Sequence, residues 1–209
     1  MRVYDHTFGS AEENLAFDDH LLERGCEAVR FWESPAPLVV LGRSGRIEDE
    51  VNVGACSAAG IPVVRRSSGG GTVLQGPGCL NYAFVLSLGD RPALLNVADS
   101  YSVVLYPVVR ALGIAGLEVL GSDIVLRGRK VSGSAQRRSR GWLLHHGTLL
   151  YRLDVSLMER VLREPKRRPT YRDSRTHRQF VGVLDLPAEE LKRRITNVWG
   201  VFSVGAQPL

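Results

Sequence analysis

The sequence has few cysteines, and none of them stands in a recognisable motif. Its three cysteines, Cys26, Cys56 and Cys79, show neither a Cys-x-x-Cys pair nor zinc-finger spacing. An odd number without such spacing fits a reducing compartment. The chain also has no apolar secretory stretch at its N-terminus and no run of about 18 apolar residues. We therefore expect a soluble, cytoplasmic protein that has no membrane partner.

Internal repeats and low-complexity segments are absent as well. This argues against a repeat architecture and against disorder between the two termini. The chain has 209 residues, which suits one large domain and leaves little room for a second. We expect a single domain over residues 1–209.

Positive charge is concentrated in two segments. The net charge is +5, but residues 127–140 contain six Lys or Arg and no acid. Residues 163–178 contain seven Lys or Arg against Glu164 and Asp173, so the rest of the chain is negative. This division favours an anionic partner on one face, which could be a nucleotide, an acidic protein or a nucleic acid. A solvated surface without a partner is the alternative.

Capping and breaker residues mark the helices. Ser10 and Glu13 form a capping-box pattern ahead of apolar residues at helical spacing. Gly113 follows another run of apolar residues at that spacing and should close its helix, and Pro187 should begin a late one. The predicted helices span residues 11–25, residues 49–59, residues 98–112 and a segment from Pro187.

Two pairs of β-rich runs predict hairpins. Residues 28–32 and 37–41 flank Glu33-Ser34-Pro35, and residues 123–126 and 130–132 flank a tight turn. Further strands are predicted at residues 63–66, 80–88 and 142–151. Strands and helices interleave without a strict βαβ rhythm. We therefore expect an α+β fold with a mixed, largely antiparallel sheet packed with helices.

Three glycines follow a predicted strand in Arg65-Arg66-Ser67-Ser68-Gly69-Gly70-Gly71-Thr72. Without Cβ atoms, the backbone N–H groups can approach a carbonyl or phosphate oxygen closely. The pattern is neither a Walker loop nor a dinucleotide motif, and a flexible turn is the alternative. Strand alternation should point one arginine into the site, where it could clamp a phosphate, and the other away.

Lys130 stands among small residues that leave room for a ligand, in Gly128-Arg129-Lys130-Val131-Ser132-Gly133-Ser134-Ala135-Gln136. Its ammonium could stabilise charge on phosphate and carbonyl oxygens during acyl transfer to AMP. A solvated hairpin lysine is the alternative. Asp123 is a candidate Mg²⁺ ligand or a turn cap. His145 and His146 are adjacent, so on a strand they point to opposite faces, one to pack and the other to bond a loop.

Taken together, these motifs make the chain resemble the lipoate-protein ligase and octanoyltransferase family, which is related to biotin-protein ligases. The resemblance extends from Asn14-Leu15-Ala16 through the two motifs above to His146-Gly147-Thr148. It implies a sheet fold shared with class II synthetase cores. It also implies that Lys130 contacts an acyl-adenylate or a thioester carbonyl, and that Gly69, Gly70 and Gly71 line the acyl pocket.

Two departures from the family bear on the mechanism. Many ligases carry a histidine where this chain has Gln75, which cannot change its charge near neutral pH. Transferases that form an acyl-enzyme use a cysteine downstream of the lysine, and no cysteine follows Cys79 here. Cys79 itself lies among apolar residues and is expected to be a packing residue. Activation by ATP is therefore favoured over an acyl-enzyme.

The resemblance predicts an enzyme that joins lipoate or octanoate to a lysine of an acidic lipoyl acceptor domain through acyl-AMP. Such an acceptor could be a dehydrogenase-complex subunit or a glycine-cleavage H-type protein. ATP with Mg²⁺ would be a substrate, with no tightly bound cofactor and no nucleic acid partner. The other binding residues are predicted to be Arg65, Arg66, Ser68, Thr72, Gln75, Gly78, Asn81, Gly133, Ser134, Ala135, Gln136, His146, Gly147 and Thr148.

An octanoyltransferase and a non-catalytic binding protein are the rival hypotheses. Many ligases of the family carry an additional C-terminal domain. Only about 55 residues follow Asp154, and they contain a basic loop and one predicted helix. We expect no complete accessory domain, so a separate subunit could supply that part.

Overall fold

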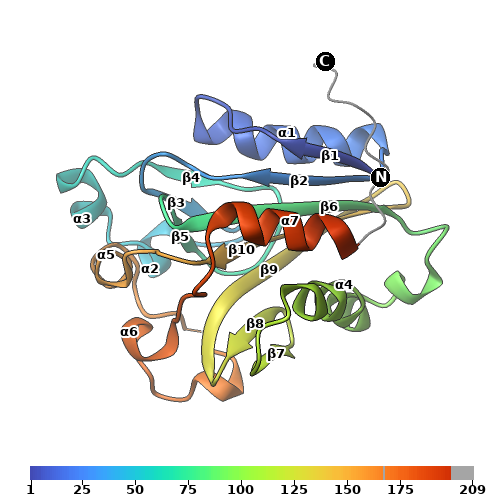
Figure 1. The fold of residues 1–209 in the computed structure, drawn as a ribbon. Helices are drawn as coiled ribbons and strands as arrows, with labels where there is room; N and C mark the ends of the chain where they lie inside the picture. The colour runs from blue at the N-terminus through green and yellow to red at the C-terminus, as the bar shows by residue number, and fades with distance from the viewer. Residues whose placement is uncertain (167, 199–209) are drawn as a thin grey trace.

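A computed structural model describes residues 1–166 and 168–198 of the chain. It has a seven-stranded sheet in the order β1-β2-β6-β10-β9-β8-β7 and a three-stranded sheet in the order β4-β3-β5 (Figure 1). In the large sheet only β1 and β2 run parallel. The strands are β1 Arg2–Asp5, β2 Ala28–Trp32, β3 Leu38–Leu41, β4 Val63–Arg65, β5 Val73–Gln75, β6 Cys79–Ser87, β7 Leu117–Leu120, β8 Asp123–Leu126, β9 Arg129–Ser139 and β10 Trp142–Leu150.

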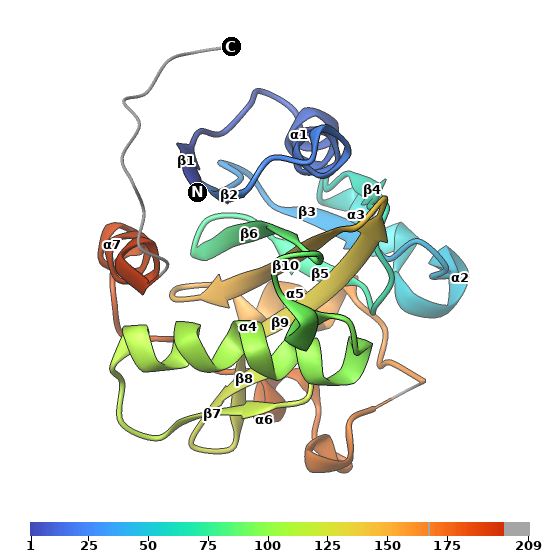
Figure 2. The ribbon, with the colours of Figure 1, turned by 90° about the vertical axis from the view of Figure 1, so that its right-hand side faces the viewer.

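Helices cover both faces of the large sheet. Figure 2 shows α1 on one side of the strands and α4 and α7 on the other. The larger core lies on the α4 and α7 side and includes Phe31, Tyr82 and Phe84. None of the described helices is long and apolar enough to cross a bilayer. The helices are α1 Ala11–Arg24, α2 Ile47–Glu50, α3 Val53–Ala58, α4 Val97–Leu112, α5 Val155–Val161, α6 His177–Phe180 and α7 Ala188–Val198, with 3₁₀ turns η1 Pro92–Leu94 and η2 Thr170–Arg172.

Local signals placed most of these helices correctly. Ser10 caps α1 in a complete capping box, and Gly25 ends that helix in the left-handed conformation. Gly113 ends α4 in the same way, at φ 59°. The β8–β9 turn has Arg127 at φ 50° and Gly128 at φ 77°, as a tight hairpin requires. These elements, and the mixed sheet with helices against it, are confirmed.

The predicted hairpin of residues 28–41 is wrong. The strand β2 pairs with β1 and β6 in the large sheet, whereas β3 pairs with β4 and β5 in the small one. Both strands are fully buried, so each can join a separate sheet. The connection is held by Glu33, whose carboxylate accepts from the Gly78 N–H at 2.8 Å and from the Tyr151 hydroxyl at 2.8 Å. Glu33 thus turns the chain from one sheet toward the other.

Other boundaries differ because pairing with distant residues decides them. The predicted helix 49–59 is two short helices, α2 and α3, with Val51 between them in a bridge to Leu162. The predicted strand 130–132 extends through β9 to Ser139, since β10 pairs with it over that length. Tertiary contacts of this kind override local propensity. These contacts determine the length of β9, the strand that carries Lys130.

Candidate active site

The glycine loop and the Lys130 strand line one cavity of about 170 Å³. Its walls come from α1, the end of β2, the glycine loop, β5, β6, β8, β9 and β10. Predicted residues in the wall are Arg66, Gly70, Gly71, Thr72, Gln75, Asn81, Asp123, Lys130, Gly133, Ser134, Ala135, His146, Gly147 and Thr148. Segments far apart in the sequence therefore meet as the motifs predicted.

Arg66 shapes the glycine loop from inside. Its Nη2 donates to the Gly69 and Gly71 carbonyls at 2.6 and 2.8 Å, and its Nε donates to Ser68 Oγ at 3.0 Å. Burial lowers the pKa of Arg66 to about 10, so it stays cationic at neutral pH. Arg65 instead points outward, where Nη1 donates to the carbonyls of Gly42, Arg43 and Gly45. The predicted alternation of the two arginines is confirmed.

The loop can lie this close because of two glycines. A Cβ on Gly42 would stand 2.1 Å from the Gly70 carbonyl oxygen, which no real side chain tolerates. Gly70 itself has φ +87°, a conformation that favours glycine. A Cβ placed on Gly70 would lie 3.6 Å from the Cβ of Ala135 in β9. The loop therefore rests directly against the strand that carries the lysine.

Lys130 is held by two neighbours in the wall. Its Nζ lies 2.8 Å from Asp123 Oδ1, and Asp123 Oδ2 accepts a hydrogen bond of 2.6 Å from the Tyr171 hydroxyl. The Asp123 residue is only 5% exposed, and the lysine side chain is 28% exposed. A Cβ on Gly133 would collide with Lys130 Nζ at 2.8 Å. The small residue at position 133 thus leaves space for the ammonium.

The two histidines divide as predicted. His145 is fully buried, and its Nδ1 lies 3.2 Å from Gln136 Nε2. Burial, and secondarily the charge of His146, lower the pKa of His145 to about 3. His146 lines the cavity, and its Nε2 lies 2.6 Å from Ser68 Oγ on the glycine loop. One histidine packs and the other fixes a loop.

Asp18 belongs to the site, although no motif in the sequence pointed to it. It lies in α1, lines the cavity, and has Oδ2 3.9 Å from His146 Nδ1. Its Oδ1 lies 2.6 Å from Nη1 of Arg30, which is completely buried. Asn14 accepts from the same guanidinium at 2.7 Å. Two polar residues four apart on a predicted helix were the available signal, since they share one face.

Five predicted residues lie outside the wall of this cavity. Gly78 packs against the backbone of Arg152, and its carbonyl accepts from the Tyr151 N–H at 2.9 Å. Gln136 and Gly69 line a neighbouring hollow together with Arg138. Ser68 touches the wall residues Arg66 and His146, and Arg65 faces outward. Wall residues that sequence reasoning missed are Leu15, Asp18, Trp32, Val73, Tyr82 and Ser122.

Neither buried cysteine is placed for nucleophilic chemistry. Cys79 and Cys56 are both packed in the second hydrophobic core, between the small sheet and α5. Burial raises the pKa of the Cys79 thiol far above neutrality. No cysteine lines the cavity among the described residues, and in that part of the chain no three acidic, His or Cys residues cluster as a metal site would need.

The described chain is thus an α+β fold with a cavity in which the glycine loop and the Lys130 strand meet. Residues 10–197 match the family model of the lipoyl protein ligase A/B catalytic domain. The chain belongs to that family, as its motifs indicated.

Curated relatives include both ligases and transferases. A putative lipoate-protein ligase A of Aeropyrum pernix is 34% identical over 163 residues, covering 75% of this chain. The chain spans 60% of the length of that relative. The octanoyltransferase LipM of Carboxydothermus hydrogenoformans is 32% identical over 186 residues, which cover 78% of this chain and 69% of the relative.

Solved structures share the fold. A bi-partite lipoate protein ligase of Thermoplasma acidophilum, studied with its E2 lipoyl domain, superposes with a TM-score of 0.80 at 23% identity. The match covers 95% of this chain and 81% of that one. A lipoate-protein ligase A bound with ATP gives a TM-score of 0.81 at 24% identity, covering 95% and 83%. The expected ligase-like architecture is therefore confirmed.

Proposed function

We propose that this protein attaches lipoate or octanoate to a lysine of a lipoyl acceptor domain, using ATP to form acyl-AMP. The observation that carries this proposal is the cavity itself. Lys130 and the glycine loop line the same cavity, and no cysteine is among the described residues of its wall. Leu15, Trp32 and Val73 give the same cavity an apolar part suited to an acyl chain. Because the described wall offers no thiol for an acyl-enzyme, the acyl group must either be activated in the cavity or arrive already activated.

The chemistry divides into two displacements. The carboxylate oxygen of the fatty acid attacks the α-phosphorus of ATP, and pyrophosphate leaves. The acceptor lysine amine then attacks the acyl carbonyl, forms the amide, loses a proton and releases AMP. Lys130 stabilises negative charge on the phosphate and carbonyl oxygens, and the glycine loop supplies backbone N–H donors.

ATP would arrive with Mg²⁺ as a substrate complex. Asp123 is the carboxylate nearest Lys130, but both of its oxygens already have partners, Lys130 and Tyr171. A single carboxylate with phosphates and waters is a common Mg²⁺ environment. The carboxylate oxygens have further lone pairs, so Asp123 could join it while it stays paired with Lys130. We therefore keep Asp123 as the proposed ligand of the ion that accompanies ATP.

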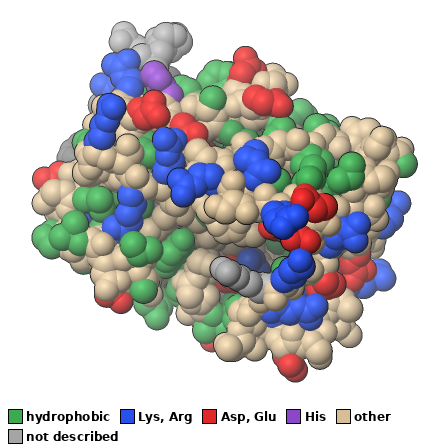
Figure 3. Space-filling view, turned by 180° about the vertical axis from the view of Figure 1, so that it is seen from behind, with side chains coloured by type: hydrophobic (Ala, Val, Ile, Leu, Met, Phe, Trp, Pro, Cys, Tyr) green, Lys and Arg blue, Asp and Glu red, His purple; other side chains and the backbone are tan. Residues whose placement is uncertain are grey.

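The acceptor is proposed to be an acidic lipoyl domain that docks by charge. The basic segment 163–178 is less free than its composition suggests, because Arg172 and Arg175 bond inward. Arg163, Lys166, Arg168 and Arg178 stay exposed, and Arg167 lies outside the described residues. On the face seen in Figure 3, basic side chains alternate with acidic ones. A solved relative was studied with its E2 lipoyl domain, which supports this class of partner.

We also propose that these 209 residues carry out the reaction either alone or together with a separate subunit. The solved Thermoplasma ligase with which it shares its fold is described as bi-partite. Mixing the protein with ATP, octanoate and acceptor domain should then give a modified acceptor. If modification appears only when a lysate fraction is added, a second subunit is required.

The decisive experiment compares two acyl donors by intact-mass measurement of the acceptor domain. A ligase modifies it with octanoate and ATP, and releases AMP and pyrophosphate. Modification by octanoyl carrier protein without ATP would instead identify an octanoyltransferase, the activity named for one relative. Binding of octanoate without either reaction would leave a non-catalytic role.

Two variants sharpen this comparison. Lys130→Ala should lower acyl-adenylate formation at least ~100-fold with the fold intact. Lys192→Ala, on α7 and outside the cavity wall, is the matched control and should keep full activity. Cys79→Ala should leave turnover unchanged, and a large loss of kcat there would contradict the ligase assignment.

A further inference from the structure

Among the described residues, only Tyr171 and Lys130 form a side-chain hydrogen bond or ion pair with the Asp123 carboxylate. The Tyr171 hydroxyl donates to Asp123 Oδ2 at 2.6 Å. The ring is half-buried and lies 5.2 Å from that of Phe180 in the second core. A tyrosine hydroxyl is protonated at physiological pH and a carboxylate can only accept, so Tyr171 is the donor.

The segment that carries Tyr171 is hydrogen-bonded to the β8–β9 hairpin, which contains Lys130. Arg175 Nη1 donates to the Gly128 carbonyl at 2.7 Å. Farther along, the Gly182 N–H donates to the carbonyl of Lys130 itself at 2.8 Å. Arg129 donates to the Val181 carbonyl at 2.6 Å. The segment 171–182 therefore contacts the lysine through its side-chain partner and through its backbone.

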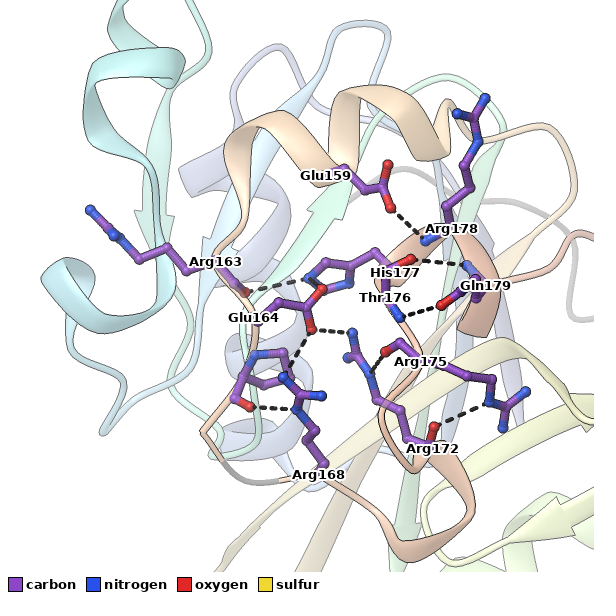
Figure 4. A network of polar contacts seen from close by, with 11 residues as sticks. Glu159, Arg163, Glu164, Arg168, Arg172, Arg175, Thr176, His177, Arg178 and Gln179 are labelled. Carbon is purple, nitrogen blue, oxygen red and sulfur yellow. Dashed lines mark hydrogen bonds and ion pairs between the residues drawn. The ribbon is translucent and has the colours of Figure 1, made fainter.

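Figure 4 shows the polar network around the buried Arg172, the residue that follows Tyr171 in the chain. Arg172 is 4% exposed, and its Nη2 donates to Glu164 Oε2 at 2.6 Å while its Nε donates to the Arg175 carbonyl at 3.1 Å. The guanidinium lies 4.8 Å from the Phe180 ring centre. Arg175 also donates to the Tyr171 carbonyl. The turn that carries Tyr171 is thus held by contacts that do not involve its hydroxyl.

We propose that Tyr171 is a positioning residue for Lys130, acting through Asp123. The hydroxyl holds one carboxylate oxygen, so that the other oxygen holds the ammonium at the cavity wall. Without the hydroxyl, the carboxylate can rotate about its χ2 angle, and the ammonium loses a single defined position. A reacting group displaced by about 1 Å can cost on the order of 100-fold in rate. The kinetic part of this inference rests on the proposed function.

The kinetic test uses Tyr171→Phe, which removes one oxygen atom and keeps the ring in the core. We expect kcat for acyl-adenylate formation to fall roughly 5- to 50-fold, with the KM values for octanoate and ATP within about threefold. Tyr106→Phe, at an exposed position of α4, is the matched control and should match the wild type. Equal thermal melting of Tyr171→Phe and wild type will exclude an unfolding effect.

A double-variant cycle tests whether Tyr171 acts through Asp123. The Asp123→Asn variant should lose activity, and adding Tyr171→Phe should lower kcat by less than about twofold more. A purely structural role of Tyr171 would instead add its full loss to that of Asp123→Asn. Additive losses, or a wild-type kcat in Tyr171→Phe, would overturn the proposal.

A second readout does not depend on the activity of the protein. Acetylation of lysines by an N-hydroxysuccinimide ester, followed by mass spectrometry, measures how firmly each amine is held. Tyr171→Phe should raise the labelling rate of Lys130 at least about threefold. Lys166, whose side chain is 73% exposed, is the internal control. An unchanged ratio between the two lysines would overturn the proposal, even if the protein proved not to be a ligase.

Discussion

His146 and Ser68 share a hydrogen bond of 2.6 Å that joins the central strand β10 to the glycine loop. Ser68 Oγ also accepts from Arg66 Nε, and the Ser68 residue is 1% exposed. The Ser68 hydroxyl therefore links Arg66 and His146, the two polar residues that hold the glycine loop. The proposed acyl site depends on where this loop rests.

Replacing Ser68 by Ala should loosen the loop. Two buried groups, Arg66 Nε and His146 Nε2, would lose their partner, so we expect a loss of about 1–3 kcal/mol in unfolding free energy. The KM for octanoate should rise severalfold, because the backbone donors of the loop would no longer be held. Urea unfolding and steady-state kinetics check both effects. Ser57→Ala, on the exposed side of α3, is the control and should change neither.

Gly42→Ala should displace the glycine loop while the rest of the fold is kept. The added Cβ would approach the Gly70 carbonyl oxygen to 2.1 Å, so the loop must move away from Gly42. We expect activity to fall by roughly 100-fold or more, since a displacement near 1 Å suffices for such a loss. Gly54→Ala in α3 meets nothing closer than 3.8 Å. It should keep activity and raise stability by up to about 1 kcal/mol.

Arg30→Met should destabilise the protein strongly. Arg30 is fully buried, pairs with Asp18, and lies among the rings of Phe8, Phe17 and Trp32. Removing one partner of a buried pair leaves an uncompensated charge and costs about 3–5 kcal/mol. Chemical denaturation will measure this loss. Arg46→Ala breaks the pairs of a largely exposed guanidinium with Glu48 and Asp49 and should cost less than about 1 kcal/mol.

Stability should fall as the solution is acidified below pH 6.5, because His145 is buried in its neutral form. Its pKa is lowered from the ordinary value of 6.5 to about 3, so the unfolded chain binds a proton that the folded chain does not. From pH 6.5 to pH 5 this one group should remove roughly 2 kcal/mol. Denaturation at both pH values measures the change. His145→Gln should lose less stability over the same range, and an equal loss would contradict this account.

Much of the fold was predictable because its signals are local. The capping box of Ser10 and Glu13, the terminal Gly113, and the turn at Arg127 and Gly128 each fix a boundary through nearby atoms. The two site motifs were also predictable, since glycines without Cβ atoms and a lysine among small residues both indicate space for a ligand. The cavity wall contains both motifs.

The rest depends on contacts between distant residues. Glu33 was read as part of a hairpin turn, but its carboxylate binds Gly78 and Tyr151 and directs the chain to another sheet. Tyr171 stands in the basic segment 163–178, yet it donates to Asp123, 48 positions away. No local pattern encodes such a pairing. Cytoplasmic location and the accessory subunit stay predictions.

The contact of Gly182 with β9 limits how the length of this part of the chain can vary. The Gly182 N–H is bonded to the Lys130 carbonyl, and a Cβ on Gly182 would meet Arg129 Cβ at 3.0 Å. Insertions at the exposed residues 168–170 can extend into solvent without moving this junction. An insertion beside Gly182 would shift the reactive amine. Natural length variation in homologues should therefore concentrate around residues 168–170 and be rare beside Gly182.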